Sequence, residues 1–220
     1  MPAHRTAPVH SVLAVVLQVR QGALQALLWE RAREPFAGAW ALPGGRLEPG
    51  ESLEASIRRH LAQKVDVREL AHLEQLETRS LPDLATAYLG LVPADADPVL
   101  PSDTAWHDVD ELPELAFDHA EIVLAGRARL RAKLSYTNAG FALAPREFTI
   151  SELREIYRAA LGHDVSATNL QRVLLRRGVL EQTGERRGPG RAGGRPAAVF
   201  RFRSRDLEIT DQFAVLRPPG

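Results

Sequence analysis

The chain has 220 residues, of which 45% are hydrophobic and 25% charged, so it has enough apolar surface for compact domains and is not wholly disordered. Because it contains no cysteine, disulfide bridges, thiolate metal sites and a cysteine nucleophile are excluded, and we expect the cytoplasm as its compartment. The apolar run at residues 12–19 is too short to cross a bilayer and no basic leader precedes it, so we expect neither export nor membrane insertion.

The formal net charge of zero is the sum of two unlike halves. Residues 1–144 carry 14 Lys and Arg against 19 Asp and Glu, whereas residues 145–220 carry 14 against 9. Between Ser166 and Arg205, ten arginines stand against two glutamates, which indicates an anionic partner; a solvated basic surface is the simpler alternative. Since domains cluster around ~100 to 150 residues, we expect two, at residues 1–140 and 145–220, with a linker at 136–145.

The first half begins with two apolar runs, at residues 11–19 and 23–30, that are rich in valine and leucine. The Gln21-Gly22 pair between them predicts a β-hairpin. A loop rich in proline and glycine follows. After it, an apolar residue recurs at every fourth position, which predicts an amphipathic helix with one buried stripe. The stripe consists of Leu53, Ile57, Leu61 and Val65.

Further strands are predicted at residues 68–79 and 84–92, followed by a loop rich in proline and aspartate up to Asp103. A second helix is predicted from Asp118 to Leu134. Between that loop and that helix, a group of polar residues can be drawn as a metal cluster, but we interpret it as a solvated loop. The group is His107, Asp108, Asp110 and Glu111.

The second half begins with a sharply marked helix. The segment 149–152, Thr-Ile-Ser-Glu, fits a capping box, and Phe148 with Leu153 fits a hydrophobic staple. Gly162 is placed to end this helix. Ser166 can cap a second helix, which Gly178 stops.

A β-hairpin is predicted after the two helices. Its strands are residues 179–182 and 197–203, and the stretch between them, at 184–195, is rich in glycine and arginine. The order helix, helix, basic hairpin predicts a winged helix-turn-helix domain. One supporting helix of that fold has no clear place in the sequence.

In the loop after the first hairpin, within the first helix and just after it, five residues fall at the intervals of a known motif: Gly45, Glu51, Arg59, Leu61 and Val67. Together with the preceding Trp-Ala-Leu-Pro-Gly at 40–44, they resemble the Nudix box, in which a glycine and a glutamate precede a helix with three further glutamates. The resemblance covers residues 9–135. It implies an α+β protein whose N-terminal domain is a Nudix-type α/β/α sandwich with a mixed sheet, joined here to the C-terminal winged helix-turn-helix.

The helix departs from the Nudix box at the positions that carry its chemistry. His60, Gln63 and Lys64 stand where that family has its three glutamates, and Asp66 replaces a glycine. These positions lie on one helical face, where glutamates would form a cluster of hard oxygen ligands for Mg²⁺, the ion that polarises a pyrophosphate. A lysine there puts a positive charge where the ion would bind. We therefore expect no catalytic residue, no metal site and no required cofactor.

Other means of holding a Nudix ligand remain in the sequence: aromatic stacking, backbone amides of the loop and basic side chains. For Trp40, packing in the core is the alternative interpretation. For Glu51, a cap between the loop and the helix is preferred to metal binding. The candidate effector-binding residues are Arg31, Arg33, Phe36, Trp40, Gly44, Gly45, Arg46 and Glu51.

The helix that begins at Ser166 has polar side chains on the face opposite Leu170 and Leu174. Asparagine can pair with adenine and arginine with guanine, at ~1 to 3 kcal/mol per good pair. Arginines among the hairpin glycines supply charge for a phosphate backbone or a minor groove, and a solvated loop without a partner is the alternative. The candidate DNA-binding residues are Thr168, Asn169, Arg172, Arg176, Arg177, Arg186, Arg187, Arg191 and Arg195.

The degraded Nudix box and the C-terminal segment together resemble the Nudix-related transcriptional regulator family (NrtR). The C-terminal part of the resemblance is carried by Phe-Thr-Ile-Ser-Glu-Leu-Arg-Glu-Ile-Tyr at 148–157 and Arg-Pro-Ala-Ala-Val-Phe-Arg-Phe at 195–202. The resemblance implies a homodimeric repressor of NAD synthesis or pentose utilisation genes. It also implies a palindromic double-stranded DNA operator as partner and ADP-ribose or a related sugar nucleotide as effector.

Two alternatives stay open at this point. The first is an active Nudix hydrolase of ADP-ribose-like substrates that uses a displaced base or metal, with an accessory C-terminal domain. Release of AMP from ADP-ribose in the presence of Mg²⁺ or Mn²⁺ would favour it. The second is an adaptor that binds an acidic protein through its basic hairpin, and failure to bind any duplex DNA at low salt would favour it.

Overall fold

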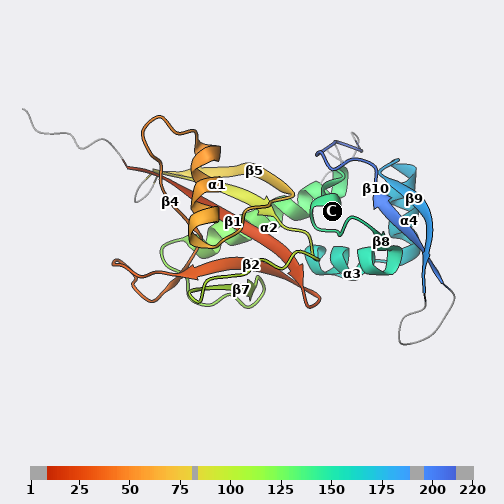
Figure 1. Cartoon of the computed structure of the whole chain (residues 1–220), viewed down its shortest axis with the longest axis horizontal. Helices are drawn as coiled ribbons and strands as arrows, with labels where there is room; N and C mark the ends of the chain where they lie inside the picture. The colour runs from red at the N-terminus through yellow and green to blue at the C-terminus, as the bar shows by residue number, and fades with distance from the viewer. Residues whose placement is uncertain (1–8, 81–83, 189–195, 212–220) are drawn as a thin grey trace, which may run out of the picture.

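The computed structural model describes residues 9–80, 84–188 and 196–211, which form two neighbouring domains (Figure 1). The N-terminal domain is built on a seven-stranded sheet, and the C-terminal domain on a three-stranded sheet with two helices. Within these ranges, none of the helices is long and apolar enough to cross a membrane.

The large sheet is mixed, as the Nudix resemblance implies. Its strands β1 (His10–Arg20) and β6 (Leu84–Leu91) run parallel, whereas its other strand pairs are antiparallel. The β1–β2 hairpin turns at Gln21-Gly22, whose φ angles of 51° and 82° are the left-handed conformation that a tight hairpin needs. The strand order is β3 (Trp40–Ala41), β2 (Ala23–Glu30), β1, β6, β5 (His72–Arg79), and in addition β4 (Gly44–Arg46) pairs with β1 and β7 (Thr104–Asp108) with β2.

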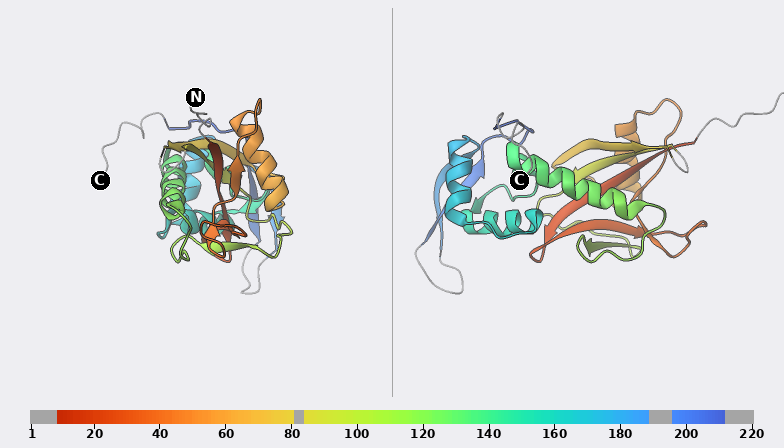
Figure 2. Two further views of the ribbon diagram at one scale, coloured as in Figure 1. Left: turned by 90° about the vertical axis from the view of Figure 1, so that its left-hand side faces the viewer. Right: turned by 180° about the vertical axis from the view of Figure 1, so that it is seen from behind.

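Helices cover both faces of this sheet, which confirms the α/β/α sandwich (Figure 2, left). Side chains of β1 alternate between the two layers. The even-numbered residues from Val12 to Val16 pack with α1 (Leu53–Lys64), and the odd-numbered residues from Val15 to Val19 pack with α2 (His119–Tyr136). Gly126 lets α2 approach β1 closely, because a Cβ there would lie 2.8 Å from the Val15 side chain.

The C-terminal domain has the predicted winged helix-turn-helix fold. Thr149 and Glu152 exchange both hydrogen bonds of a capping box, and Gly162 ends the first helix with a φ of 75°. The Ser166 hydroxyl accepts the Asn169 N–H at 3.4 Å and so caps the second helix. The elements in chain order are η1 (Ala139–Ala142), a 3-10 helix, then β8 (Phe148–Thr149), α3 (Ile150–Leu161), α4 (Ala167–Arg176), β9 (Leu180–Arg187) and β10 (Ala197–Phe202).

The prediction of a linker at 136–145 is wrong, because this segment belongs to the core. Phe141 and the three residues that follow it are at most 1% exposed, and the apolar cluster that they join runs from β1 to Phe202. The 3-10 helix η1 stands in the place of the supporting helix that the sequence left open. With four residues and only small or apolar side chains, it is too short to produce a helical period.

Strand β7 is another element that the sequence did not predict. It pairs with β2, so His107 and Asp108 lie on a strand and not in the solvated loop that we expected. The Gly-rich loop contains the short strands β3 and β4. Strand β5 begins at His72 rather than at residue 68, and β9 extends to Arg187 rather than ending at 182.

Candidate functional site

Helix α1 and the loop before it form one wall of the candidate site. Ser52 caps the helix, its hydroxyl accepting the Ala55 N–H at 3.1 Å. Arg59 donates two hydrogen bonds of 2.8 Å to Glu51 in the loop. The hydrogen bonds from Arg59 lower the pKa of Glu51 to about 2. Glu51 therefore ties the loop to the helix, and its carboxylate is already engaged.

The three side chains that replace the Nudix glutamates take different positions. The His60 ring is buried, where burial lowers its pKa, and its Nε2 donates to the Arg46 carbonyl at 3.0 Å. Gln63 is exposed. The Lys64 Nζ donates to the Gly44 carbonyl at 2.6 Å and lies 4.4 Å from the centre of the Trp29 ring.

This set of residues does not fit the divalent metal of a Nudix hydrolase. Among the described residues, no three histidine, aspartate or glutamate side chains are grouped so as to hold an ion. Mg²⁺ needs hard oxygen ligands. Here the His60 Nε2 donates a hydrogen bond to the Arg46 carbonyl, and Lys64 adds a positive charge. Water activation by a metal at this helix has no support from the residues present.

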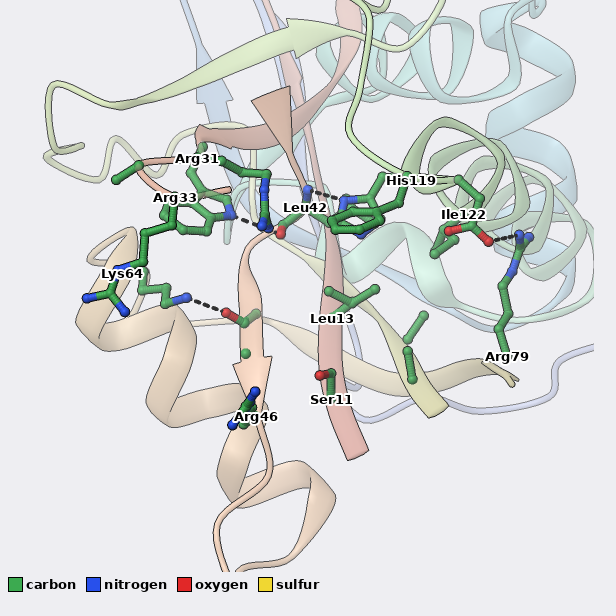
Figure 3. Close-up of a pocket in the computed structure, with 18 of the residues that line it drawn as sticks. Ser11, Leu13, Arg31, Arg33, Leu42, Arg46, Lys64, Arg79, His119 and Ile122 are labelled. Carbon is green, nitrogen blue, oxygen red and sulfur yellow. Dashed lines mark hydrogen bonds and ion pairs between the residues drawn. The ribbon is translucent and has the colours of Figure 1, made fainter. Parts of the chain in front are cut away.

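A cavity of about 880 Å³ opens between the loop, the sheet and the N-terminus of α2 (Figure 3). Small-molecule sites have volumes of ~300 to 1,000 Å³, so a nucleotide-sized ligand fits. The cavity is lined by Ser11, Leu13, Trp29, Arg31–Glu34, Leu42, Gly44–Arg46, Lys64, Arg79, Ala85, Ala87, Phe117–His119 and Ile122.

Positive charge gathers on one side of this cavity. Arg79, on the opposite side, donates to Asp118 at 2.6 Å (Figure 3). It also donates to Glu121 at 3.0 Å, so its charge is neutralised. The other cations have no ion-pair partner within the described ranges of the chain. An anionic ligand group is therefore attracted to that side. The unpaired cations are Arg31, Arg33, Arg46 and Lys64.

Two of the lining rings are held by the Leu42 backbone. The Trp29 Nε1 donates to the Leu42 carbonyl at 3.0 Å, and the His119 Nδ1 accepts the Leu42 N–H at 3.0 Å. Burial lowers the pKa of His119 to about 4, so the imidazole is neutral at pH 7. Both rings are fixed before any ligand arrives.

Five of the eight predicted effector-binding residues line the cavity, and three do not. Trp40 packs edge-on against His107 at 4.4 Å, as the core-packing alternative has it. Phe36 is 49% exposed and contacts Phe117, with ring centres 4.8 Å apart. Glu51 is bound to Arg59. The role of the five in binding a ligand stays a prediction; they are Arg31, Arg33, Gly44, Gly45 and Arg46.

Sequence reasoning missed the lining residues that the sheet and α2 bring in. Trp29 lies at the end of a predicted strand, where periodicity does not reveal which face borders a cavity. Arg79 and Asp118 are 39 positions apart and meet only in the folded chain. Phe117 and His119 stand at the start of a helix that was predicted for its buried stripe alone.

The exposed face of α4 carries the side chains predicted to contact DNA, at the end of the molecule away from α1 (Figure 1). Arg172 donates to the Asn169 Oδ1 at 2.7 Å, so these two side chains lie next to each other. Arg176 has no protein partner within the described chain. Leu170 and Leu174 are buried on the other face. The exposed set is Thr168, Asn169, Arg172 and Arg176.

Two other predicted DNA-binding arginines are held by the protein itself. The Arg177 side chain is 12% exposed, donates to the Ser135 carbonyl at 2.6 Å and pairs with Asp211 at 3.2 Å. It joins α4 to the end of α2 and does not share the face of Asn169. Arg187 pairs with Glu152 through two contacts of 2.6 Å, which partly neutralises it.

Of the hairpin arginines predicted to bind DNA, Arg186 is the described one that forms no ion pair within the described residues, so it is available to a phosphate. Arg186 is exposed on β9 and donates one hydrogen bond of 3.3 Å, to the Pro196 carbonyl. Arg191 and Arg195 lie outside the described residues, so their contacts with DNA stay a prediction.

The two halves of the sequence match two family models. Residues 8–125 match the NUDIX domain, and residues 140–202 match the NrtR DNA-binding winged helix domain. Over 216 residues the chain is 32% identical to the ADPR responsive transcriptional repressor NtrR of Acinetobacter baylyi, an alignment that covers 92% of this chain and 85% of that protein.

Solved structures share the same arrangement. The crystal structure of Shewanella oneidensis NrtR complexed with a 27mer DNA matches with a TM-score of 0.75 and 31% identity, over 88% of this chain and 93% of that one. The NUDIX domain of the same Shewanella protein, in a cocrystal with ADP ribose, matches with a TM-score of 0.50 and 32% identity, over 59% of this chain and 93% of that one.

A Nudix domain with His60, Gln63 and Lys64 in place of the three helix glutamates, packed against a winged helix with a basic exposed face, defines a class of protein. It is a transcriptional regulator in which a NUDIX domain is joined to a DNA-binding winged helix domain. The identity of 32% to the Acinetobacter repressor, over 92% of this chain, also identifies the family. The chain belongs to the NrtR family of Nudix-related transcriptional regulators.

Proposed function

We propose that this protein is a repressor whose binding to its operator is weakened by ADP-ribose or a similar nucleotide sugar, and that it does not hydrolyse this effector. The carrying observation is a cavity with four unpaired cations beside a helix that lacks the Nudix glutamates. A diphosphate finds opposite charge there, while a metal-activated water does not form. The names of the Acinetobacter and Shewanella relatives support the same effector.

DNA recognition falls to the exposed face of α4. Asn169, Arg172 and Arg176 present the donors and acceptors that read base edges in a major groove, and Arg186 is placed for a phosphate. A homodimer would offer two such helices to the half-sites of a palindromic operator, one or more helical turns apart. The complex of the Shewanella relative with a 27mer DNA supports this assignment. Regulation of NAD synthesis or pentose utilisation genes and a cytoplasmic location stay predictions.

Helix α2 offers a route between the two sites. Its first residue, His119, lines the cavity. Near its other end, the Arg131 Nε donates to the Ala160 carbonyl of α3 at 3.2 Å, and the Ser135 carbonyl accepts the hydrogen bond from Arg177 of α4. An effector that binds one position of α2 more tightly would favour that position and thereby change the spacing of the two recognition helices in a dimer.

The test uses the full-length protein and the DNA upstream of its own gene. Affinity is measured at two salt concentrations with and without saturating ADP-ribose, and parallel samples with Mg²⁺ or Mn²⁺ are assayed for AMP. We expect specific binding that ADP-ribose weakens and no AMP. Operator affinity that ADP-ribose and its close analogues leave unchanged at fixed salt would contradict the effector assignment.

The same experiment separates the two alternatives. Turnover of ADP-ribose without specific DNA binding would establish a hydrolase and would contradict the role given to His60, Gln63 and Lys64. Failure to bind any duplex DNA, even at low salt where phosphate contacts are strongest, would favour the protein-binding adaptor.

A further inference from the structure

Lys64 places a positive charge without an ion-pair partner among the described residues in the wall of the cavity. Its Nζ donates to the Gly44 carbonyl at 2.6 Å and lies 4.4 Å from the centre of the Trp29 ring. An ammonium has three N–H donors, of which the carbonyl takes one. Across the described ranges, no carboxylate lies within ion-pair distance of it. The ammonium is therefore held at the loop with its charge uncompensated (Figure 3).

The surroundings make this charge costly in the absence of an anion. Burial lowers the pKa of Lys64, and the nearby Arg31, Arg33 and Arg59 lower it further by repulsion. A buried charge is tolerated when an opposite charge completes its environment. Among the described residues, the lining carboxylate Asp118 is paired with Arg79 and Glu34 makes no ion pair with Lys64, so a diphosphate group of a ligand can supply the opposite charge.

His60 contacts the same backbone segment, residues 44–46, and so helps to hold this segment against the helix that carries Lys64. The His60 ring packs against Gly45, where a Cβ would overlap the ring, and its Nε2 holds the Arg46 carbonyl at 3.0 Å. Lys64 holds the Gly44 carbonyl two residues earlier. Two of the three residues that replace the Nudix glutamates, His60 and Lys64, therefore hold the loop backbone against α1 through hydrogen bonds, and no metal ion is involved.

We propose that Lys64 is a fixed cation that takes over, toward the diphosphate of the effector, the charge that a divalent ion provides in a Nudix hydrolase. Effector binding is then independent of Mg²⁺. The inference rests on the function proposed above and narrows the ligand class to diphosphate esters such as nucleoside diphosphate sugars. A tethered ammonium binds the diphosphate without generating a nucleophilic water, so it also separates sensing from hydrolysis.

The test is isothermal titration of ADP-ribose into the full-length protein, once with EDTA and once with Mg²⁺. Three variants are compared: Lys64→Gln, Lys64→Arg and, as a control, Arg58→Gln. Arg58 lies on the same helix and pairs with Glu54 at 2.9 Å, outside the cavity, so its loss removes the same charge without touching the ligand. Thermal unfolding and operator binding without ADP-ribose report whether each variant is folded.

We expect equal affinity of the unchanged protein in both buffers. Lys64→Gln should weaken binding about tenfold or more, the scale of one hydrogen bond to a charged group. Lys64→Arg should retain most of the affinity, and Arg58→Gln all of it. Rescue by arginine distinguishes the charge from a packing role of the side chain.

Binding that EDTA abolishes and Mg²⁺ restores would overturn the inference, as would a Lys64→Gln variant with unchanged affinity. The metal comparison uses the unchanged protein, so it tests the independence from Mg²⁺ even if a variant does not fold. ADP-ribose binding that leaves operator affinity unchanged would contradict the proposed function alone. No ADP-ribose binding in either buffer would overturn both.

Discussion

Two adjacent arginines at the end of α4 provide a charge-matched test of the DNA-binding face. Arg176 is exposed and has no protein partner in the described chain, whereas the Arg177 side chain is 12% exposed and bound to the Ser135 carbonyl and Asp211. Replacing either residue with glutamine removes one positive charge. We expect Arg176→Gln to weaken DNA binding and Arg177→Gln to lower the free energy of unfolding.

The structure sets the size of each effect. If Arg176 contacts a phosphate, its loss reduces the slope of log K against log salt by about 0.9, and if it contacts a base edge, it costs about 1 to 3 kcal/mol of operator affinity. Arg177→Gln removes the charged hydrogen bond to the Ser135 carbonyl and the ion pair with the Asp211 carboxylate, whose side chain is 19% exposed. We expect a loss of about 1 to 3 kcal/mol in unfolding free energy.

Fluorescence anisotropy over a salt series measures the operator affinity of each variant, and urea unfolding measures its stability. The prediction requires opposite patterns in two neighbouring residues of equal charge. Equal operator affinities and equal salt slopes for both variants, or a loss of DNA affinity confined to a stably folded Arg177→Gln, would refute the conclusion that α4 presents Arg176 and withholds Arg177.

Three further substitutions test the structure. Although burial opposes it, hydrogen bonds with His72 and Lys133 lower the pKa of Glu74 from 4.5 to about 2, so this stabilisation is complete above about pH 4.5 and is lost as the pH falls toward 2. Glu74→Gln should remove that part of the acid dependence in urea titrations at several pH values. Thr149→Ala removes the capping box and should cost about 1 kcal/mol in urea unfolding, and no loss would contradict the cap. Phe141→Ala should lower the free energy of unfolding by about 3 to 5 kcal/mol and destabilise both domains. An unchanged free energy of unfolding would instead support the prediction of a linker at 136–145.

Elements with local signals could be predicted from the sequence. The Gln21-Gly22 turn, the capping box of Thr149 and Glu152, and the Gly162 helix end each depend on a few neighbouring residues, and the structure confirms all three. The apolar stripe on α1 is also local, because the period of a helix is visible in a single segment. The sandwich itself is predicted from the resemblance to the Nudix box, since every residue at 12–17 is apolar and the two faces of β1 cannot be told apart in the sequence.

Features that depend on distant partners could not be predicted. Phe141 lies in a short run of small and apolar residues between an asparagine and a proline, which is also typical of a loop, and only packing against both domains makes it core. Helical spacing put Arg177 next to the DNA-binding face, but the Ser135 carbonyl, 42 positions away, decides its direction. The cavity joins Trp29, Arg79 and His119 from three elements, so no segment contains its pattern.

The buried η1 segment limits how this regulator can be recombined. A winged helix cut out at residue 145 would leave Phe141 and its neighbours behind and expose the apolar surface that they cover on α3. A chimera with a different sensor would keep its DNA-reading part intact only if the exchange point lay before the last turns of α2, where Leu130 and Leu134 already belong to the common core. In this fold, η1 and the last turns of α2 therefore have to be kept together with the winged helix when the sensor domain is exchanged.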